Sequence, residues 1–143
     1  MQIPHDALVV VADGRKLLMF RNEGDGLHVN LQVERKEIHE NPKDGDQKTD
    51  LAGRASSTVS GSMEETDYHQ LEEDRFAAEV AAILKKGALT NGYDHLIIAA
   101  PPRTLGELRK NYHKEVSARL LAEIDKDLTG HPVPEIEKLL QNA

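Results

Sequence analysis

The sequence of 143 residues contains no cysteine and no tryptophan, with only two phenylalanines and three tyrosines. Without cysteine, the chain can form no disulfide, thiolate nucleophile or Cys-ligated zinc or iron–sulfur site. So few aromatic rings argue against a surface that binds single-stranded RNA by stacking its bases. The chain starts without a basic segment followed by an apolar core, and no apolar run is long enough to cross a membrane. We therefore expect a cytoplasmic protein without membrane insertion.

Positive charge is also in the minority. Lys and Arg number 18 against 25 Asp and Glu, which gives a net charge of −7. This balance favours solubility and opposes a uniformly basic face for nucleic acid. The 38% of hydrophobic residues and the 30% of charged ones fit a soluble chain that carries a polar loop. The length predicts a single domain over residues 1–143.

Strands are predicted in the first third of the chain. The β-branched run at 8–11 and the apolar run at 16–21 flank Asp13-Gly14, which predicts a hairpin in which Gly14 takes the positive φ of a type I′ turn. A third strand with alternating apolar residues begins at Leu27 and continues towards Ile38. Together they predict a three-stranded antiparallel meander.

Residues 41–66 are small and polar, so we expect a long mobile loop within the domain. A helix should follow it. Ser62 with Glu65 forms a capping box, and Thr66 or Asp67 offers a later start. Gly87, after two lysines, is the predicted C-cap of this helix.

The next segment predicts a buried strand, a corner and a helix. The strand covers 95–100 and must stop at Pro101-Pro102, because proline cannot donate to a sheet. Thr104 with Glu107 forms another capping box, which predicts the start of a helix whose apolar face continues to Val116. In α/β proteins, ligands often bind where a strand's carboxyl end meets the next helix.

A strand at 120–124 and a helix with Pro134 in its first turn complete the prediction. The resulting order is β-β-β-α-β-α-β-α, with the long polar loop before the first helix. Three antiparallel strands followed by crossovers form a mixed sheet with helices on its faces. The predicted class is therefore α/β with a mixed sheet, in the element order of ribonuclease H-like folds.

Several short segments, in this order and spacing, resemble the family of bacterial host-attachment proteins, which is related to the middle domain of archaeo-eukaryotic peptide-chain release factors. They are Val11 to Gly14, Gly53-Arg54, Asp67 to His69, Arg75 to Ala77, Ala100 to Pro102, Leu105 to Arg109, and Glu123 to Thr129. The resemblance implies a ribonuclease H-like fold and a link to RNA or the ribosome. The family label implies instead a role in attachment to host cells, which would be indirect for a cytoplasmic protein.

The resemblance does not extend to the release reaction. In release factors the long loop carries a Gly-Gly-Gln motif that promotes peptidyl-tRNA hydrolysis. This sequence has no Gly-Gly-Gln and places Gly53-Arg54 and Gly61-Ser62 in the loop instead. We therefore expect a non-catalytic binding domain with no catalytic residue, metal or cofactor.

A metal-dependent nuclease or hydrolase on the same fold is an alternative. Such catalysis needs several carboxylates around metal ions, for which Asp13 and either Glu72 or Glu73 are candidates. However, the buried strand ends in Ala-Pro-Pro-Arg, without a carboxylate. Asp13 also has an ordinary structural role in a hairpin turn.

The only local run of positive charge lies between Arg103 and Arg119. It could bind phosphate groups of RNA, although ordinary ion pairs on a solvated helix face are the more common arrangement. His69 stands at a helix start beside the polar loop, where a capping or packing role is more common than a functional one. The candidate binding residues are Arg54, His69, Arg103, Arg109, Lys110 and Lys114.

Overall fold

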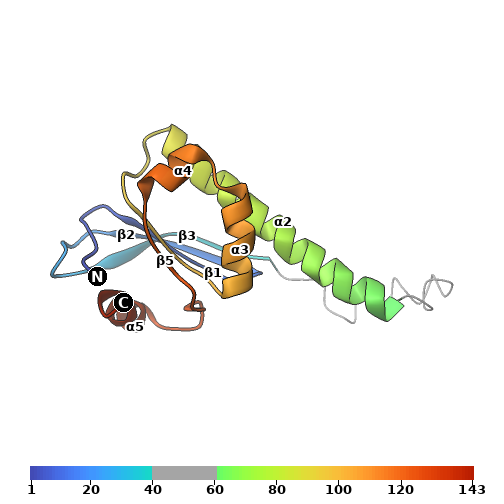
Figure 1. The fold of residues 1–143 in the computed structure, drawn as a ribbon. Helices are drawn as coiled ribbons and strands as arrows, with labels where there is room; N and C mark the ends of the chain where they lie inside the picture. The colour runs from blue at the N-terminus through green and yellow to red at the C-terminus, as the bar shows by residue number, and fades with distance from the viewer. Residues whose placement is uncertain (40–60) are drawn as a thin grey trace.

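Five strands form one mixed sheet in the computed structural model, which describes residues 1–39 and 61–143, with only the backbone of residues 61–66. The strands are β1 (Leu8–Ala12), β2 (Lys16–Asn22), β3 (Leu31–Ile38), β4 (Leu96–Ala99) and β5 (Leu120–Ile124). Their order is β3-β2-β1-β4-β5 (Figure 1). The first three are antiparallel neighbours, whereas β4 runs parallel to β1 and β5 parallel to β4. The predicted α/β class with a mixed sheet is confirmed.

The hairpin between β1 and β2 forms where the sequence predicted it, but its turn is not type I′. No glycine among the described residues has a positive φ, so Gly14 does not use the conformation expected of it. Instead, Oδ1 of Asp13 accepts the backbone N–H groups of Arg15 and Lys16 at 2.7 and 2.6 Å. The carboxylate thus closes the turn, a role for which aspartate is well suited.

The third strand begins at Leu31 and not at Leu27, so its predicted start was wrong. Oδ1 of Asp25 accepts the N–H groups of Leu27 and His28, which draws these residues into a turn. Leu27 is consequently 71% exposed. Apolar alternation alone could not separate this turn from the strand that follows.

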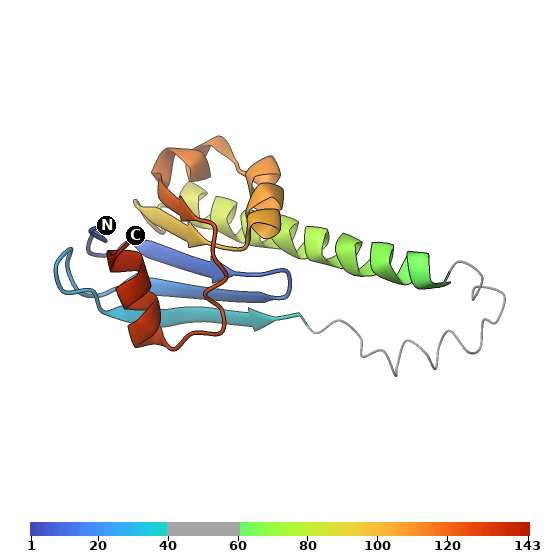
Figure 2. The ribbon, with the colours of Figure 1, turned by 60° about the horizontal axis from the view of Figure 1, so that its bottom comes forward.

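Helix α2 (Gly61–Leu89) contains 29 residues and is about 43 Å long at about 1.5 Å per residue. It begins before Ser62, so the end of the segment predicted as a loop is helical and Ser62 with Glu65 lies inside the helix. The remaining loop residues lie outside those that the structure describes. Among residues 67–89 of α2, the buried side chains all come from Phe76 onward. Its N-terminal half extends beyond the sheet (Figure 2).

The predicted C-cap of α2 at Gly87 was also wrong, because the helix continues to Leu89. The left-handed residue that ends it is Asn91, with φ 56°. The Gly92 N–H donates to the Gly87 carbonyl at 2.7 Å, and the Asn91 N–H donates to the Ala88 carbonyl at 3.2 Å, as in a Schellman motif. Gly87 is instead needed inside the helix, since a Cβ there would lie 2.9 Å from the Tyr93 ring.

The helix predicted to continue to Val116 is divided into α3 (Pro102–Asn111) and α4 (Lys114–Arg119). Pro102 stands in the first turn of α3 and no side chain caps it, so the capping box at Thr104 was wrong. His113 separates the two helices. Its Nδ1 accepts the Glu115 N–H at 3.0 Å and so caps α4. The observed order is therefore β-β-β-α-β-α-α-β-α.

Helices cover both faces of the sheet. One hydrophobic core lies between the sheet and helices α2, α3 and α4, and includes Phe76, Leu84, Leu108 and Val116. The other lies beneath α5 (Val133–Gln141), which has Pro134 in its first turn as predicted. Figure 2 shows α5 on the face opposite α2. This two-sided cover explains why β1 and β4 are entirely buried. None of the described helices is apolar over a length sufficient to span a bilayer.

Candidate functional site

Most of the cations predicted to form a basic patch are held in ion pairs. The stretch from Arg103 to Arg119 is divided between α3 and α4. Each of three cations has a carboxylate partner: Arg109 with Glu123 at 2.9 Å, Lys110 with Glu107 at 2.7 Å, and Arg119 with Glu115 at 2.9 Å. These pairs offset much of the positive charge that the sequence places here.

Glu123 of β5 is shared by two partners from the C-terminal end of α3. Its Oε1 accepts from Nε of Arg109 at 3.0 Å, and its Oε2 accepts the Tyr112 hydroxyl at 2.9 Å. Burial raises the pKa of Tyr112 well above its usual range, and the hydrogen bond to Glu123 raises it further. The hydrogen bond with Glu123 also raises the pKa of Arg109. Arg109 is thus a structural link between α3 and β5.

Arg103 and Lys114 differ from their neighbours. Both are exposed, and neither forms an ion pair with any residue of ranges 1–39 and 67–143. The hydrogen bond to Glu107 raises the pKa of Lys110, while the charge of Arg103 opposes this rise. Arg103 therefore lies on the same side of α3 as Lys110, in agreement with their helical spacing. Lys114 is the first residue of the separate helix α4.

His69 lies on α2, in the N-terminal half that precedes the first buried residue, Phe76. It is half-buried, and its ring centroid lies 6.0 Å from that of Tyr68. The prediction that His69 lies at the start of this helix was therefore wrong, because α2 begins at Gly61. Arg54 lies outside the described residues.

The carboxylates proposed for the hydrolase alternative are held by other contacts. Besides closing its turn, Asp13 accepts the Thr129 hydroxyl on Oδ2 at 3.1 Å. Glu72 pairs with Arg75 at 2.8 Å. Glu73 does reach the same edge of the sheet, where a Cβ added to Gly14 would lie 2.6 Å from its Oε1. Within the part of the chain whose side chains are described, no three His, Asp or Glu residues are grouped as metal ligands.

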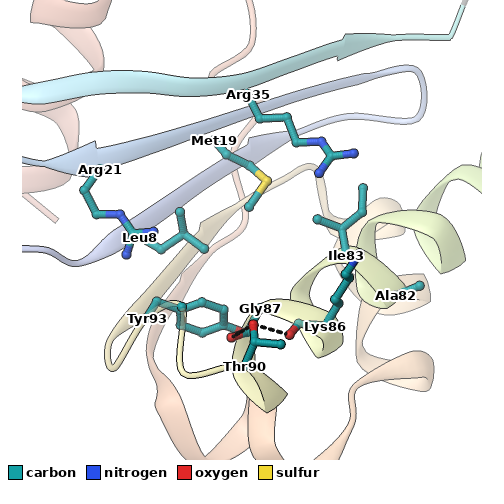
Figure 3. A pocket seen from close by; sticks show the side chains of 11 residues that line it. Leu8, Met19, Arg21, Arg35, Ala82, Ile83, Lys86, Gly87, Thr90 and Tyr93 are labelled. Atoms are coloured by element: carbon teal, nitrogen blue, oxygen red, sulfur yellow. Dashed lines mark hydrogen bonds between the residues drawn. The ribbon is translucent and has the colours of Figure 1, made fainter.

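Sequence reasoning did not find the hollow between β3 and α2. This hollow has a volume of about 550 Å³ (Figure 3). Its lining combines apolar side chains with three cations, Arg21, Arg35 and Lys86. The partner of Arg35 across the sheet is Met19, beside a shift in register between Met19 and Phe20. The sequence gives no sign of this irregularity. It therefore could not predict that the Arg35 side chain lies on the side of the sheet that faces α2.

Comparison with known proteins bears on the whole fold described above. A model of bacterial archaeo-eukaryotic release factor family 12 matches residues 6–140. No curated protein matches the chain. The match covers all five strands and nearly all of α5, and it agrees with the resemblance to release-factor relatives found in the sequence. The chain therefore belongs to bacterial archaeo-eukaryotic release factor family 12.

Proposed function

We propose that this chain is a non-catalytic cytoplasmic domain that binds ribosomal RNA and acts in translation. The observation that carries the proposal is the match to a release-factor family over residues 6–140. The exposed cations Arg103 and Lys114 support contact with phosphate groups, because neither is neutralised by a described carboxylate.

We also assign the domain to the ribonuclease H-like folds. The strand order β3-β2-β1-β4-β5 supports this assignment, together with the antiparallel meander and the two parallel crossovers. The long helix α2 precedes β4, and two short helices precede β5. The N-terminal end of α2 extends beyond the sheet (Figure 2).

A binding role is favoured over peptide release because the sequence contains no Gly-Gly-Gln. The sequence between β3 and α2 contains Arg54, which is the candidate RNA-binding cation that lies near the beginning of α2 in sequence. Hydrolysis by carboxylate-bound metals has less support, since the Asp13 carboxylate accepts two backbone N–H groups and a hydroxyl.

The proposed RNA contacts form two groups. Arg103 and Lys114 are the primary contacts, and Arg54 extends them along the segment that precedes α2. Arg109 and Lys110 contribute less, because each already has a carboxylate partner. His69 is proposed as a further contact, since it lies in the N-terminal half of α2, the helix that follows Arg54 in sequence.

Ribosome co-sedimentation across a salt series tests the proposal. The double variant Arg103→Gln/Lys114→Gln should bind more weakly than the parent chain, with the slope of log affinity against log salt reduced by roughly one for each cation removed. Lys138→Gln is the matched control, because Lys138 is an exposed lysine of α5 on the opposite face of the sheet. Absence of ribosome binding at low salt, or equal losses in the control, would refute the proposal.

A further inference from the structure

Apolar side chains line both walls of the hollow between β3 and α2. Leu8 and Met19 come from the sheet, Ile83 comes from α2, and Tyr93 follows the turn after α2. Figure 3 shows the Met19 and Leu8 side chains directed into the space between the walls. The volume of about 550 Å³ lies within the usual range of small-molecule sites.

Tyr93 contributes its ring carbons and not its hydroxyl to this wall. The hydroxyl donates to the Leu84 carbonyl at 2.7 Å inside the core. Gly87 lets the ring lie directly against α2, since even one Cβ there would approach the ring to 2.9 Å. The interior of the hollow is therefore suited to a hydrocarbon or aromatic group.

Two cations with unused donors face the hollow from opposite walls. Arg35 of β3 donates to Glu37 through Nε at 2.7 Å, while its two terminal nitrogens donate to no described residue. Figure 3 shows its guanidinium directed from β3 towards Ile83 on α2. Lys86 of α2 also lines the hollow, and it forms no ion pair with any side chain in the described part of the chain.

Arg21, the third cation of the lining, is already satisfied. Both Nε and a terminal nitrogen donate to Glu34, at 2.8 and 3.1 Å, and the other terminal nitrogen donates to the Asp6 carbonyl. It therefore closes one end of the hollow without supplying a free charge. Lys86 has no carboxylate partner among the described side chains, and Arg35, which pairs with Glu37 through Nε at 2.7 Å, keeps two terminal nitrogens that donate to no described residue. An anion bound beside both side chains would accept charge-assisted hydrogen bonds from each.

We propose that the hollow is a binding site for a small organic anion. Its carboxylate or phosphate group lies between Arg35 and Lys86, and its apolar body lies against Met19, Ile83 and the Tyr93 ring. None of the residues proposed to contact RNA lines the hollow. The inference consequently does not depend on the proposed function.

The test uses the full chain labelled with ¹⁵N and three probes, each below any critical micelle concentration: decanoate, decyl phosphate and inorganic phosphate. We expect saturable chemical-shift changes at Gly87 and Thr90, which line the hollow, with decanoate or decyl phosphate. The comparison of these two probes identifies the preferred head group. Inorganic phosphate should bind at least about tenfold more weakly than decyl phosphate, because it has no methylene groups to bury against the apolar wall.

Variants separate the charge from the apolar wall. Arg35→Gln/Lys86→Gln should weaken binding at least about tenfold, as expected for the loss of charge-assisted hydrogen bonds. Lys36→Gln/Lys85→Gln is the matched control, because these exposed neighbours on the same two elements do not line the hollow. Ala82→Trp should weaken binding by occupying the hollow, since Ala82 is an exposed residue of its wall.

Three results would overturn the proposal. The first is the absence of saturable binding by both decyl probes, and the second is shift changes confined to residues away from the hollow. The third is equal affinity of the two double variants. Ribosome binding should be unaffected by Ala82→Trp, so failure of this site and failure of the proposed function are measured separately.

Discussion

Arginine and lysine occur both in the α3–α4 stretch and in the hollow between β3 and α2, but their surroundings differ. In α3 and α4, Arg109, Lys110 and Arg119 each lie within 2.9 Å of a carboxylate oxygen. In the hollow, Arg35 pairs with Glu37 at 2.7 Å and Arg21 with Glu34 at 2.8 Å, whereas Lys86 has no carboxylate partner among the described side chains. Both regions therefore hold paired and unpaired cations. They differ in where the remaining donors lie: Arg103 and Lys114 are exposed on helices, whereas the terminal nitrogens of Arg35 lie beside an apolar hollow.

In α3 and α4, the ion pairs differ in which element supplies the carboxylate. Glu107 and Glu115 lie one helical turn from the cations that they neutralise, so these pairs are local. Glu123 comes from β5 and reaches α3 only after the strand has paired with β4. In the hollow, Arg35 of β3 and Lys86 of α2 belong to opposite walls. Charge density along a chain therefore does not identify a binding surface until the pairing is known.

Loss of the Glu123 carboxylate should have the largest effect on the α3–α4 side of this comparison. Glu123→Ala leaves the Tyr112 hydroxyl and the Arg109 guanidinium without their shared acceptor. We expect the free energy of unfolding to fall by about 2 kcal/mol through the loss of the acceptor for the half-buried Tyr112 hydroxyl, while the exposed Arg109 pair adds little. Urea denaturation measures this change.

Glu107→Ala is the control for Glu123→Ala. It removes a carboxylate of similar exposure, 20% against 19%, but one that pairs only with an exposed lysine of its own helix. Its cost should be below about 1 kcal/mol. Equal losses in the two variants would show that Glu123 is an ordinary surface carboxylate and not a link between α3 and β5.

The sequence was sufficient for those elements whose pattern is local. The apolar runs predicted both ends of β1 and of β4 to within one residue, and the double proline marked the end of β4. The polar and apolar pattern could not locate the break between α3 and α4. That break depends on Tyr112 reaching Glu123 of β5 and on the His113 ring capping the next helix. The contact with Glu123 requires the finished sheet, whereas the His113 cap is local.

The candidate site shows the same limit. The exposed positions of Arg103, Arg109 and Lys110 on α3 followed from their spacing, but Lys114, which was predicted on the same helix, lies on α4. The pair of Lys110 with Glu107 is local, whereas the pair of Arg109 with Glu123 could not be predicted, because the whole of α4 separates these two residues. The hollow was missed for a related reason. Gly87 looked like a helix end because the sequence does not reveal that the Tyr93 ring occupies the space beside it.

Tyr93 allows the core behind the hollow to be tested through pH. Burial raises the pKa of Tyr93 from its ordinary value of 10.0 to about 12, against a lowering by the charge of Arg119. The folded state thus favours the protonated phenol. This preference stabilises the folded state fully below about pH 10. The stabilisation is lost as pH rises through about 12, and the loss by pH 12 is about 2 kcal/mol.

Urea denaturation of Tyr93→Phe at pH 9 and pH 12 measures this contribution. At pH 9 the variant should be less stable by about 1 kcal/mol, because it lacks the hydrogen bond to the Leu84 carbonyl. At pH 12 it should equal or exceed the parent chain, since it cannot ionise. Tyr68→Phe is the control, as Tyr68 is 38% exposed. A stability difference that stays constant with pH would contradict burial of the phenol.

The smallest expected effect tests whether pairing, rather than charge alone, controls RNA binding by α3. Glu107→Gln frees Lys110, which lies on the same side of α3 as Arg103. Ribosome affinity at low salt should rise about twofold, in keeping with the modest energy of an exposed ion pair. Glu115→Gln removes the same charge but leaves Arg119 bonded to the Tyr93 and Glu115 carbonyls, with its side chain only 16% exposed. Arg119 therefore remains unavailable to phosphate, and this variant should show no gain. An equal rise in both variants would mean that net charge governs binding, and that the contrast between paired and unpaired cations has no functional meaning in this stretch.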